Sequence, residues 1–229
     1  AFEHGLGRRE QSLAAFSLAK GRAMHPNPAF RNTSLADNLA FARTRGFGIL
    51  SVNGPEGPLA AHVPFLISSD ASHAELHLAR SNPVGRACLA GPVPGLIAIS
   101  GPDAYVSPDW YGSADQVPTW NYIAVHLRGT LTALPESTLQ PHVEAVSAEH
   151  ESRLLPKTPW QTAKMSEGAM PRMLRMILPF RFDIAAIDGT WKLNQNKTPD
   201  MRRSAADHLA RQDDPGSQAI AALMRHNLE

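Results

Sequence analysis

Apolar residues recur along the chain at two spacings, and these spacings predict its secondary structure. Over residues 34–45 the apolar positions follow one helix face, and Ser34 with Asp37 forms a capping box. Elsewhere apolar and polar residues alternate, which predicts strands. The predicted strands cover 47–53, 59–67, 74–80, 93–100, 104–106, 120–134 and 180–187. We expect the strand over 120–134 to be the longest.

Turn-forming residues separate these segments. The sequence Asn-Gly-Pro-Glu-Gly-Pro over 53–58 predicts a hairpin, and Asp188 with Gly189 predicts another hairpin turn that leads to Trp191. Asn82 followed by Pro83 predicts the start of a short helix. Further helices are predicted over 137–150 and 170–178, and in a tail interrupted at 213–215. Short strands interspersed with helices predict a mainly β fold with peripheral helices, an antiparallel barrel rather than a parallel sheet.

Composition bounds the class of protein. The 229 residues carry 22 basic and 21 acidic side chains, and 43% of the residues are hydrophobic. This size suits a single globular domain, predicted over 24–229 and preceded by an extension over 1–23 without regular periodicity. No segment has the length of a membrane span or the pattern of a secretory signal, so we expect a cytoplasmic protein. The balanced charge argues against a large nucleic-acid surface.

The sequence lacks several common catalytic motifs. GxGxxG, GxxxxGK[ST], GxSxG and HExxH are all absent, and the single cysteine, Cys88, lies in an apolar pattern typical of a buried, inert thiol. A structural zinc site is therefore excluded. His73, Glu75 and His77 alternate on one strand face and could converge on a metal, although exposed polar alternation is ordinary for a half-buried strand.

Polar residues at the start of the predicted helix form a first candidate binding site. Arg80, Ser81 and Asn82 stand where a strand delivers a guanidinium group to free backbone N–H groups, a combination that suits a phosphate. The alternative is a capped helix beside a solvated arginine.

Two further clusters combine aromatic, amide and cationic side chains. The residues of the first suit a planar ligand, or equally a core or dimer interface. They include Trp110, Tyr111, Thr119, Trp120, Asn121 and Tyr122. In the second, Lys192, Gln195 and Asn196 follow Trp191; amides can read the edge of a heterocycle and lysines can approach phosphate, whereas a plain polar loop is the alternative.

Five ordered motifs together closely resemble those of the PaiB-like FMN-binding negative transcriptional regulators. They are HVPF from His62, HLARSNP from His77, GPDAYVSPDWY from Gly101, VPTWNY from Val117 with His126 and Gly129, and KLNQNK from Lys192. The resemblance covers about residues 24–224. Asn194 stands where that family usually has serine, which preserves a hydrogen-bonding group.

The resemblance implies a fold and a cofactor that periodicity alone does not. It implies an FMN-binding split β-barrel related to flavin reductases and pyridoxamine phosphate oxidases, a homodimer with FMN near the subunit interface. Arg80, Ser81 and Asn82 would lie near the phosphate. The residues that would line or complete the ring pocket are Trp110, Tyr111, Thr119, Trp120, Asn121, Tyr122, Lys192, Gln195 and Asn196, with His62 as a further cofactor contact.

Other functions stay open at this point. A bound flavin could serve an oxidoreductase of unknown substrate, with His62, His77 and His126 as candidates for proton transfer, and a barrel of this kind could instead bind haem. Direct DNA binding is expected to be weak. The tail helices could mimic a helix-turn-helix through their arginines, but their apolar spacing predicts that they pack on the barrel. Those arginines are Arg202, Arg203, Arg211 and Arg225.

Overall fold

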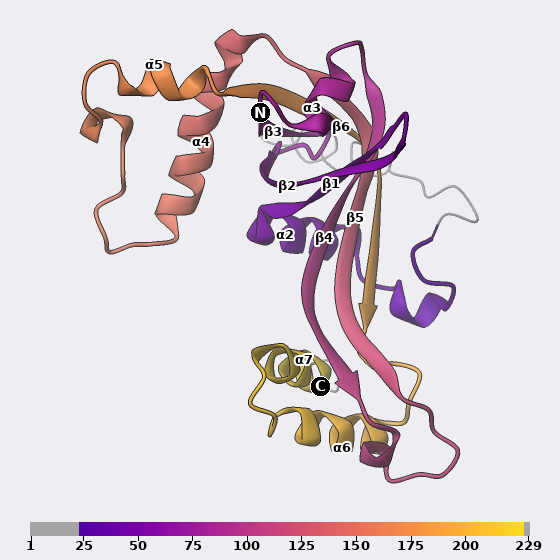
Figure 1. Ribbon diagram of the computed structural model, residues 1–229. Coiled ribbons are helices and arrows are strands. Elements are labelled where there is room, and N and C mark those ends of the chain that lie inside the picture. The colour runs from indigo at the N-terminus through magenta and orange to yellow at the C-terminus, as the bar shows by residue number, and fades with distance from the viewer. Residues whose placement is uncertain (1–22, 227–229) are drawn as a thin grey trace, which may run out of the picture. The chain divides into compact units, whose positions relative to one another are not determined.

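A computed structural model describes residues 23–226 of the chain (Figure 1), so the predicted extension over 1–23 lies outside the described residues apart from Ala23. Six strands form a closed barrel in the order β1-β2-β3-β6-β5-β4. They are β1 (Phe47–Gly54), β2 (Gly57–Ile67), β3 (His73–Ala79), β4 (Val93–Val106), β5 (Thr119–Ala133) and β6 (Ile177–Lys192). The pairs β1–β2, β2–β3, β3–β6 and β1–β4 are antiparallel.

Helices precede, interrupt and follow the strands. The α-helices are α2 (Leu35–Arg45), α3 (Pro83–Cys88), α4 (Leu139–Ser152), α5 (Ala169–Leu174), α6 (Pro199–Leu209) and α7 (Pro215–His226). Short 3₁₀ turns are η1 (Pro28–Phe30), η2 (Pro108–Tyr111), η3 (Glu136–Thr138) and η4 (Thr162–Lys164). None of the helices in the described part of the chain is long and apolar enough to cross a membrane.

The locally encoded elements form where the sequence predicts them. At the start of α2 the Asp37 N–H donates to Ser34 Oγ over 3.0 Å, and the Ser34 hydroxyl donates to the Asp37 carboxylate over 2.6 Å. Asn82 caps α3 by accepting from the Val84 N–H over 2.9 Å. β1 and β2 form the predicted hairpin, with Gly54 paired to Gly57. The capping box, the Asn-Pro helix start and the turn cluster are therefore confirmed.

Two predicted interruptions are wrong. β4 is one strand from Val93 to Val106, and its pairing with β1 covers only Gly95–Ala98, so Pro102 lies beyond that neighbour, where a missing N–H is tolerated. β6 continues through Asp188 and Gly189 without a hairpin turn. At 16 residues β6 is also longer than β5 with 15, and residues 177–178, predicted as helix, begin this strand.

Gly189 serves close packing rather than a turn. It is buried in the strand, and a Cβ atom there would meet the Asn38 Oδ1 at 2.0 Å. That oxygen accepts a hydrogen bond of 2.9 Å from the Trp191 indole N–H. The missing side chain thus gives room to Asn38, which binds the next residue but one along β6.

The chain divides into two compact units, each with its own core. Unit 1 comprises residues 39–99 and 126–187 of the described chain, and unit 2 comprises 23–38, 100–125 and 188–226. The core of unit 1 is built from alternate strand residues and contains the fully buried side chains of Leu50, Phe65, Leu76, Ile97, Leu127, Leu131, Phe180 and Phe182.

The core of unit 2 joins the tail helices to the ends of the strands. Leu209 of α6 and Ile220 and Met224 of α7 pack with Val106 and Leu193, and all five are fully buried. The apolar spacing of the tail is therefore a packing pattern, as predicted. Arg202 is only 9% exposed, so it does not form part of a surface patch.

A second glycine allows two strands of unit 1 to approach closely. A Cβ atom on Gly129 of β5 would lie 1.9 Å from the Asp183 carbonyl oxygen of β6 and 2.9 Å from the Phe182 ring. The nearest obstacle is backbone, which cannot rotate away as a flexible side chain can.

We therefore expect Gly129→Ala to lower the free energy of unfolding by about 3 kcal/mol or more, because the barrel would have to open at β5 and β6. Urea denaturation measures the change. Gly112→Asn is the matched control, since Gly112 has φ +61° with nothing within 4 Å of its Cβ position, and asparagine tolerates that conformation. Equal stability of Gly129→Ala and the wild type would contradict the packing described.

Candidate functional site

A cavity of about 230 Å³ lies in unit 2, where the end of β6 meets the start of β5. Four of its lining residues belong to the site expected from the sequence: Tyr111, Thr119, Lys192 and Asn196. The others are His25, Phe30, Val117, Asn194 and Lys197. The continuous course of β6 delivers Lys192 to the cavity, and the turn after the strand delivers Asn194, Asn196 and Lys197.

Among the described residues, two ammonium groups and no carboxylate line the cavity. Lys192 donates to the Thr119 hydroxyl and stands 5.8 Å from the centre of the Phe30 ring. Lys197 donates to the Gln116 side-chain oxygen and stands 5.1 Å from the centre of the Tyr111 ring. Burial lowers the pKa of Lys192. Because two lysines and no acidic residue of the described chain line the cavity, its lining is positive and suits an anion or an electron-rich ring edge.

Asn194 holds an unusual conformation at the wall of this cavity. Its φ is +60°, a left-handed value that asparagine adopts more readily than serine. Its side-chain oxygen accepts from the Tyr111 hydroxyl over 3.3 Å. Its buried amide nitrogen has no acceptor within residues 23–226. A buried donor without an acceptor is costly, so this amide favours a ligand that offers an oxygen or nitrogen lone pair.

Gln195 shapes the loop rather than lining the cavity. Its side-chain oxygen accepts from the Leu193 N–H over 2.7 Å, and its amide nitrogen donates to the Trp191 carbonyl. Both contacts are local, and together they hold the turn that presents Asn194 and Asn196.

The aromatic cluster expected from the sequence divides in the structure. Tyr111 lines the cavity, and burial raises its pKa. Trp110 instead stacks on His208, with 5.6 Å between ring centres. Trp120 is 54% exposed and meets the edge of Tyr105 at 6.3 Å.

The two residues after Trp120 also stay outside the cavity lining. Asn121 is fully buried and donates to the Met224 sulfur over 3.3 Å, and Tyr122 is half-buried on the same strand. Within this cluster, therefore, Tyr111 and Thr119 reach the cavity that contains Lys192.

The predicted phosphate residues lie together in unit 1, at the start of α3. Arg80 already makes a two-pronged ion pair with Glu136, at 3.1 and 2.9 Å, and its Nε donates to the Arg175 carbonyl over 3.0 Å. Ser81 is exposed, while the Asn82 side chain caps the helix. His62, also in unit 1, is exposed and stacks on Phe47 at 6.3 Å. A phosphate at Arg80 would compete with Glu136 for the same guanidinium fork.

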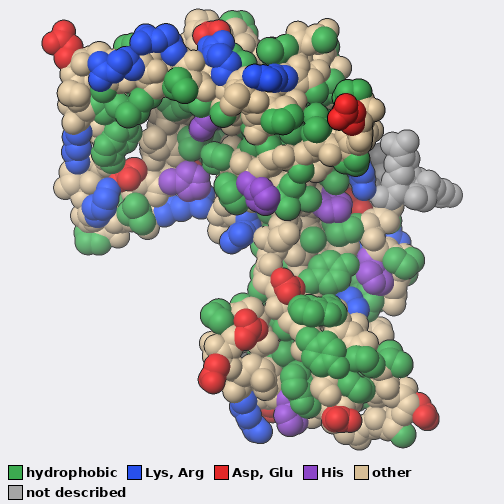
Figure 2. All heavy atoms as spheres, in the orientation of Figure 1, with side chains coloured by type: hydrophobic (Ala, Val, Ile, Leu, Met, Phe, Trp, Pro, Cys, Tyr) green, Lys and Arg blue, Asp and Glu red, His purple; other side chains and the backbone are tan. Residues whose placement is uncertain are grey.

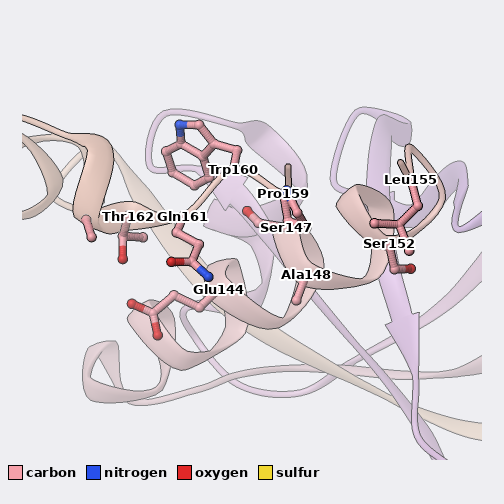
Figure 3. A pocket seen from close by; sticks show the side chains of 10 residues that line it. Glu144, Ser147, Ala148, Ser152, Leu155, Pro159, Trp160, Gln161 and Thr162 are labelled. Carbon is pink, nitrogen blue, oxygen red and sulfur yellow. The ribbon is translucent and has the colours of Figure 1, made fainter. Parts of the chain in front are cut away.

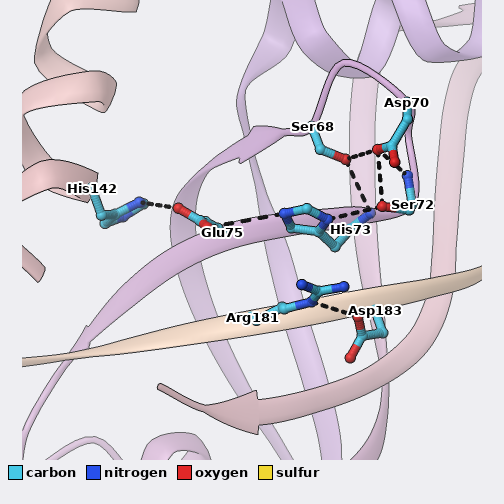
Figure 4. A network of polar contacts seen from close by, with 8 residues as sticks. All are labelled: Ser68, Asp70, Ser72, His73, Glu75, His142, Arg181 and Asp183. Atoms are coloured by element: carbon cyan, nitrogen blue, oxygen red, sulfur yellow. Dashed lines mark hydrogen bonds and ion pairs between the residues drawn. The ribbon is translucent and has the colours of Figure 1, made fainter. Parts of the chain in front are cut away.

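His73 of β3 belongs to a polar network with Glu75 and His142 (Figure 4). The His77 Nδ1 lies 3.1 Å from the His142 Nε2. The Glu75 carboxylate lies 3.7 Å from the His142 Nδ1 and 3.9 Å from the His73 Nε2. The network continues through Ser72 to Asp70, which accepts from the Ser68 and Ser72 hydroxyls. Within residues 23–226 no group of three or more His, Cys, Asp or Glu side chains could hold a metal ion, and this includes His73, Glu75 and His77.

Cys88 is buried, as predicted for an inert thiol. Its Sγ donates to the Leu131 carbonyl over 3.2 Å, and burial raises its pKa. The thiolate, which would be the reactive form, is therefore disfavoured.

Sequence reasoning missed part of the cavity wall. His25, Phe30 and Val117 carry no motif that marks them as ligand contacts, and the first two precede β6 by more than 140 residues. Asn194 and Lys197 belong to the KLNQNK motif but were not among the predicted cofactor contacts. The available signal was that they lie close to Asn196 in a short turn after a strand.

Comparison with known proteins places the chain among flavin-binding proteins. The model of the family described as "Putative FMN-binding domain" matches residues 24–186. The Bacillus subtilis (strain 168) protein named protease synthase and sporulation protein PAI 2 is 27% identical over 202 residues, which cover 87% of this chain and 96% of that protein. An uncharacterized protein of Aspergillus fumigatus is 25% identical over 205 residues, covering 68% of this chain and 78% of that protein.

Two solved structures share the fold at low sequence identity. The FAD and haem binding protein from Mycobacterium smegmatis aligns with a TM-score of 0.53 and 14% identity, covering 71% of this chain and 73% of that chain. The conserved hypothetical protein Rv2991 from Mycobacterium tuberculosis aligns with a TM-score of 0.51 and 12% identity, covering 75% and 92%. The expected mainly β split barrel with peripheral helices is thus confirmed.

The buried histidine network predicts a loss of stability in mild acid. Burial and the nearby His77 lower the pKa of His142 to about 4, although Glu75 acts in the opposite direction. The unfolded chain takes up this proton near pH 6.5, so it binds more protons than the folded chain between pH 6.5 and about 4. The contribution of neutral His142 to the free energy of unfolding is therefore fully present above pH 6.5 and is lost as the pH falls toward about 4. We expect the free energy of unfolding to drop by about 1–2 kcal/mol from pH 7 to pH 5 on this account.

Urea denaturation of wild type and His142→Gln at both pH values measures this effect. The glutamine variant should lose less stability between pH 7 and pH 5 than the wild type, whereas His226→Gln at an exposed position should behave like the wild type. The same pH dependence in all three proteins would show that His142 does not titrate differently on folding.

Proposed function

The chain belongs to the FMN-binding domain family and binds FMN, and on that premise we propose that it is a homodimeric, PaiB-like negative transcriptional regulator with its flavin near the subunit interface. The observation that carries the proposal is the cavity at the end of β6. Its two lysines have no carboxylate partner within the described residues, and the buried Asn194 amide lacks an acceptor. When bound, FMN supplies a ring system that accepts electrons or hydride.

Each of the two units, taken by itself, offers residues suited to one chemical group of FMN. Arg80 and Ser81 in unit 1 would hold the phosphate, with Asn82 fixing the start of α3. Lys192 and the Asn194 amide in unit 2 would donate to the carbonyl edge of the ring, where positive charge stabilises developing negative charge. Tyr111, Thr119 and Asn196 would complete that part of the pocket.

Cavity size and surface chemistry support a dimer. The cavity of about 230 Å³ is smaller than the roughly 300–1,000 Å³ of typical cofactor and ligand sites, so a second surface would have to close it around FMN. In the same unit Trp120 and Tyr105 are 54% and 47% exposed and contact each other edge to face. Exposed aromatic pairs of this kind are enriched at protein interfaces.

FMN titration of the apoprotein should separate the two roles. Arg80→Ala should weaken FMN binding by about 1.5–3 kcal/mol, the range for hydrogen bonds to a charged group. The affinity for riboflavin, which has no phosphate, should not change. Lys192→Met should lower the affinities for FMN and riboflavin by the same factor, since Lys192 would face the ring that both flavins share. Glu136→Gln removes the carboxylate that competes with the phosphate for Arg80, so it should raise the affinity for FMN. Flavin fluorescence quenching measures each affinity, with the wild type as the reference.

Two results would overturn the assignment. If Arg80→Ala weakened riboflavin as much as FMN, the phosphate would lie elsewhere, and equal behaviour of Lys192→Met and wild type would remove Lys192 from the ring. Sedimentation velocity of the FMN-loaded protein tests the dimer, because a monomer that retains FMN would contradict the interface site.

Regulation is proposed to be indirect, with weak DNA binding by the isolated protein. In the tail helices Arg202 is buried, Arg203 pairs with Asp200 at 2.7 Å and Arg225 pairs with Asp207 at 2.6 Å. These contacts leave little positive surface for phosphate contacts or base readout. Fluorescence anisotropy at about 150 mM salt should give no affinity as tight as about 10⁻⁸ M for any site. Tight, sequence-specific binding that Arg203→Ala abolishes would establish a direct regulator.

A further inference from the structure

A larger cavity, of about 470 Å³, lies in unit 1 between α4 and the segment that follows it (Figure 3). One wall is the helix face that carries Glu144, Ser147 and Ala148. The opposite wall is formed by residues 155–163, including Leu155 and Trp160. Its volume falls within the range of small-molecule sites. It shares no lining residue with the cavity around Lys192.

The wall opposite α4 is held in place by one carboxylate. Glu151 accepts from the Trp160 N–H over 2.7 Å and also from the Lys157 ammonium. These contacts lower the pKa of Glu151, so its carboxylate stays ionised at neutral pH. At the other side Arg153 donates to the Thr44 carbonyl over 2.6 Å and to Glu149. The segment is thus tied to the body of unit 1, and the cavity exists before any ligand binds.

The lining is mainly apolar, with a single formal charge. Leu155, Pro159 and Trp160 supply apolar and aromatic surface, and Trp160 is 37% exposed. In Figure 2 hydrophobic side chains gather around the hollow beside α4, and Lys and Arg side chains lie at its outer edge. Exposed aromatic surface in a concave site favours a ligand with an apolar or aromatic body.

Glu144 is the charged residue of the lining. Its carboxylate accepts from the Gln140 amide over 3.1 Å, and it forms no ion pair within residues 23–226. Two lysines of the segment that follows α4 are engaged elsewhere: Lys157 donates to Glu151, and Lys164 lies 3.5 Å from the Pro159 carbonyl. A carboxylate at the edge of an apolar cavity attracts a cation and repels an anion.

We propose that this cavity binds a small organic amine with an apolar or aromatic body, at a site separate from the flavin. The aromatic ring of such a ligand lies against Trp160, and its ammonium group faces Glu144. Ser147, Gln161 and Thr162 offer further hydrogen bonds at the polar rim. The site therefore selects by charge as well as by shape.

The test uses the full, FMN-saturated chain, so that the flavin site is filled, and three probes of the same shape. These are phenethylamine, 2-phenylethanol and 3-phenylpropionate, which carry a positive, a neutral and a negative group. Isothermal titration calorimetry should give the tightest binding for the amine and the weakest for the carboxylate. A direct contact with Glu144 in a solvent-exposed setting corresponds to about a fivefold preference of the amine over the alcohol.

Two variants separate the charge from the aromatic contact. Glu144→Gln should weaken phenethylamine about fivefold and leave 2-phenylethanol unchanged. Glu167→Gln, at an exposed position outside the cavity, is the matched control and should bind both as wild type does. Trp160→Ala should weaken both probes by a similar factor, since each places its ring against the indole.

Four outcomes would overturn the proposal, and the first three concern the amine group and Glu144. They are the absence of saturable phenethylamine binding at about 10 mM probe, equal affinity for the amine and the carboxylate, and equal losses in Glu144→Gln and Glu167→Gln. Failure of Trp160→Ala to change either affinity would also do so, because the ligand would then lie elsewhere. Circular dichroism of each variant verifies that the fold is retained.

Discussion

The uninterrupted course of β6 is the constraint on which the candidate flavin site depends. The strand can continue past Asp188 only because Gly189 has no side chain, and the space is taken by Asn38, whose oxygen binds the Trp191 indole. A strand that ended at Asp188 would not carry Lys192 to Thr119 or the following turn to Tyr111. A contact between a helix and a strand glycine thus sets the position of the cationic residues.

The elements that the sequence predicts well are those whose reasons are local. A capping box, an Asn-Pro helix start and a turn cluster each bring their hydrogen-bond partners within a few residues, so α2, α3 and the β1–β2 hairpin form where expected. The interruptions predicted in β4 and β6 fail for a different reason. Asp188-Gly189 is typical of a turn when only its neighbours are considered, but the space that Gly189 leaves is used by Asn38, some 150 residues away.

The residues of the cavity around Lys192 also divide into those that local sequence predicts and those that depend on distant parts of the chain. Tyr111, Thr119, Lys192 and Asn196 could be anticipated because they stand in motifs whose order resembles one family. His25 and Phe30 could not, because their presence in the cavity depends on where η1 lies in unit 2 and not on any pattern around them. Asn194 is intermediate: its position in the motif was visible, while its left-handed backbone and the amide without an acceptor emerge only from the fold.

A chain with nearly balanced charge can still present local sites of opposite sign, because its basic and acidic side chains are unevenly distributed between such sites. Arg80, Arg203 and Arg225 each meet a carboxylate, and Glu151 meets Lys157. What remains unpaired within the described residues then decides what can bind. Lys192 and Lys197 in unit 2 favour an electron-rich ligand, and Glu144 in unit 1 favours a cation. Because the described lining of each site carries charge of one sign, each site acts with the sign of its own side chains, and net charge alone could indicate neither.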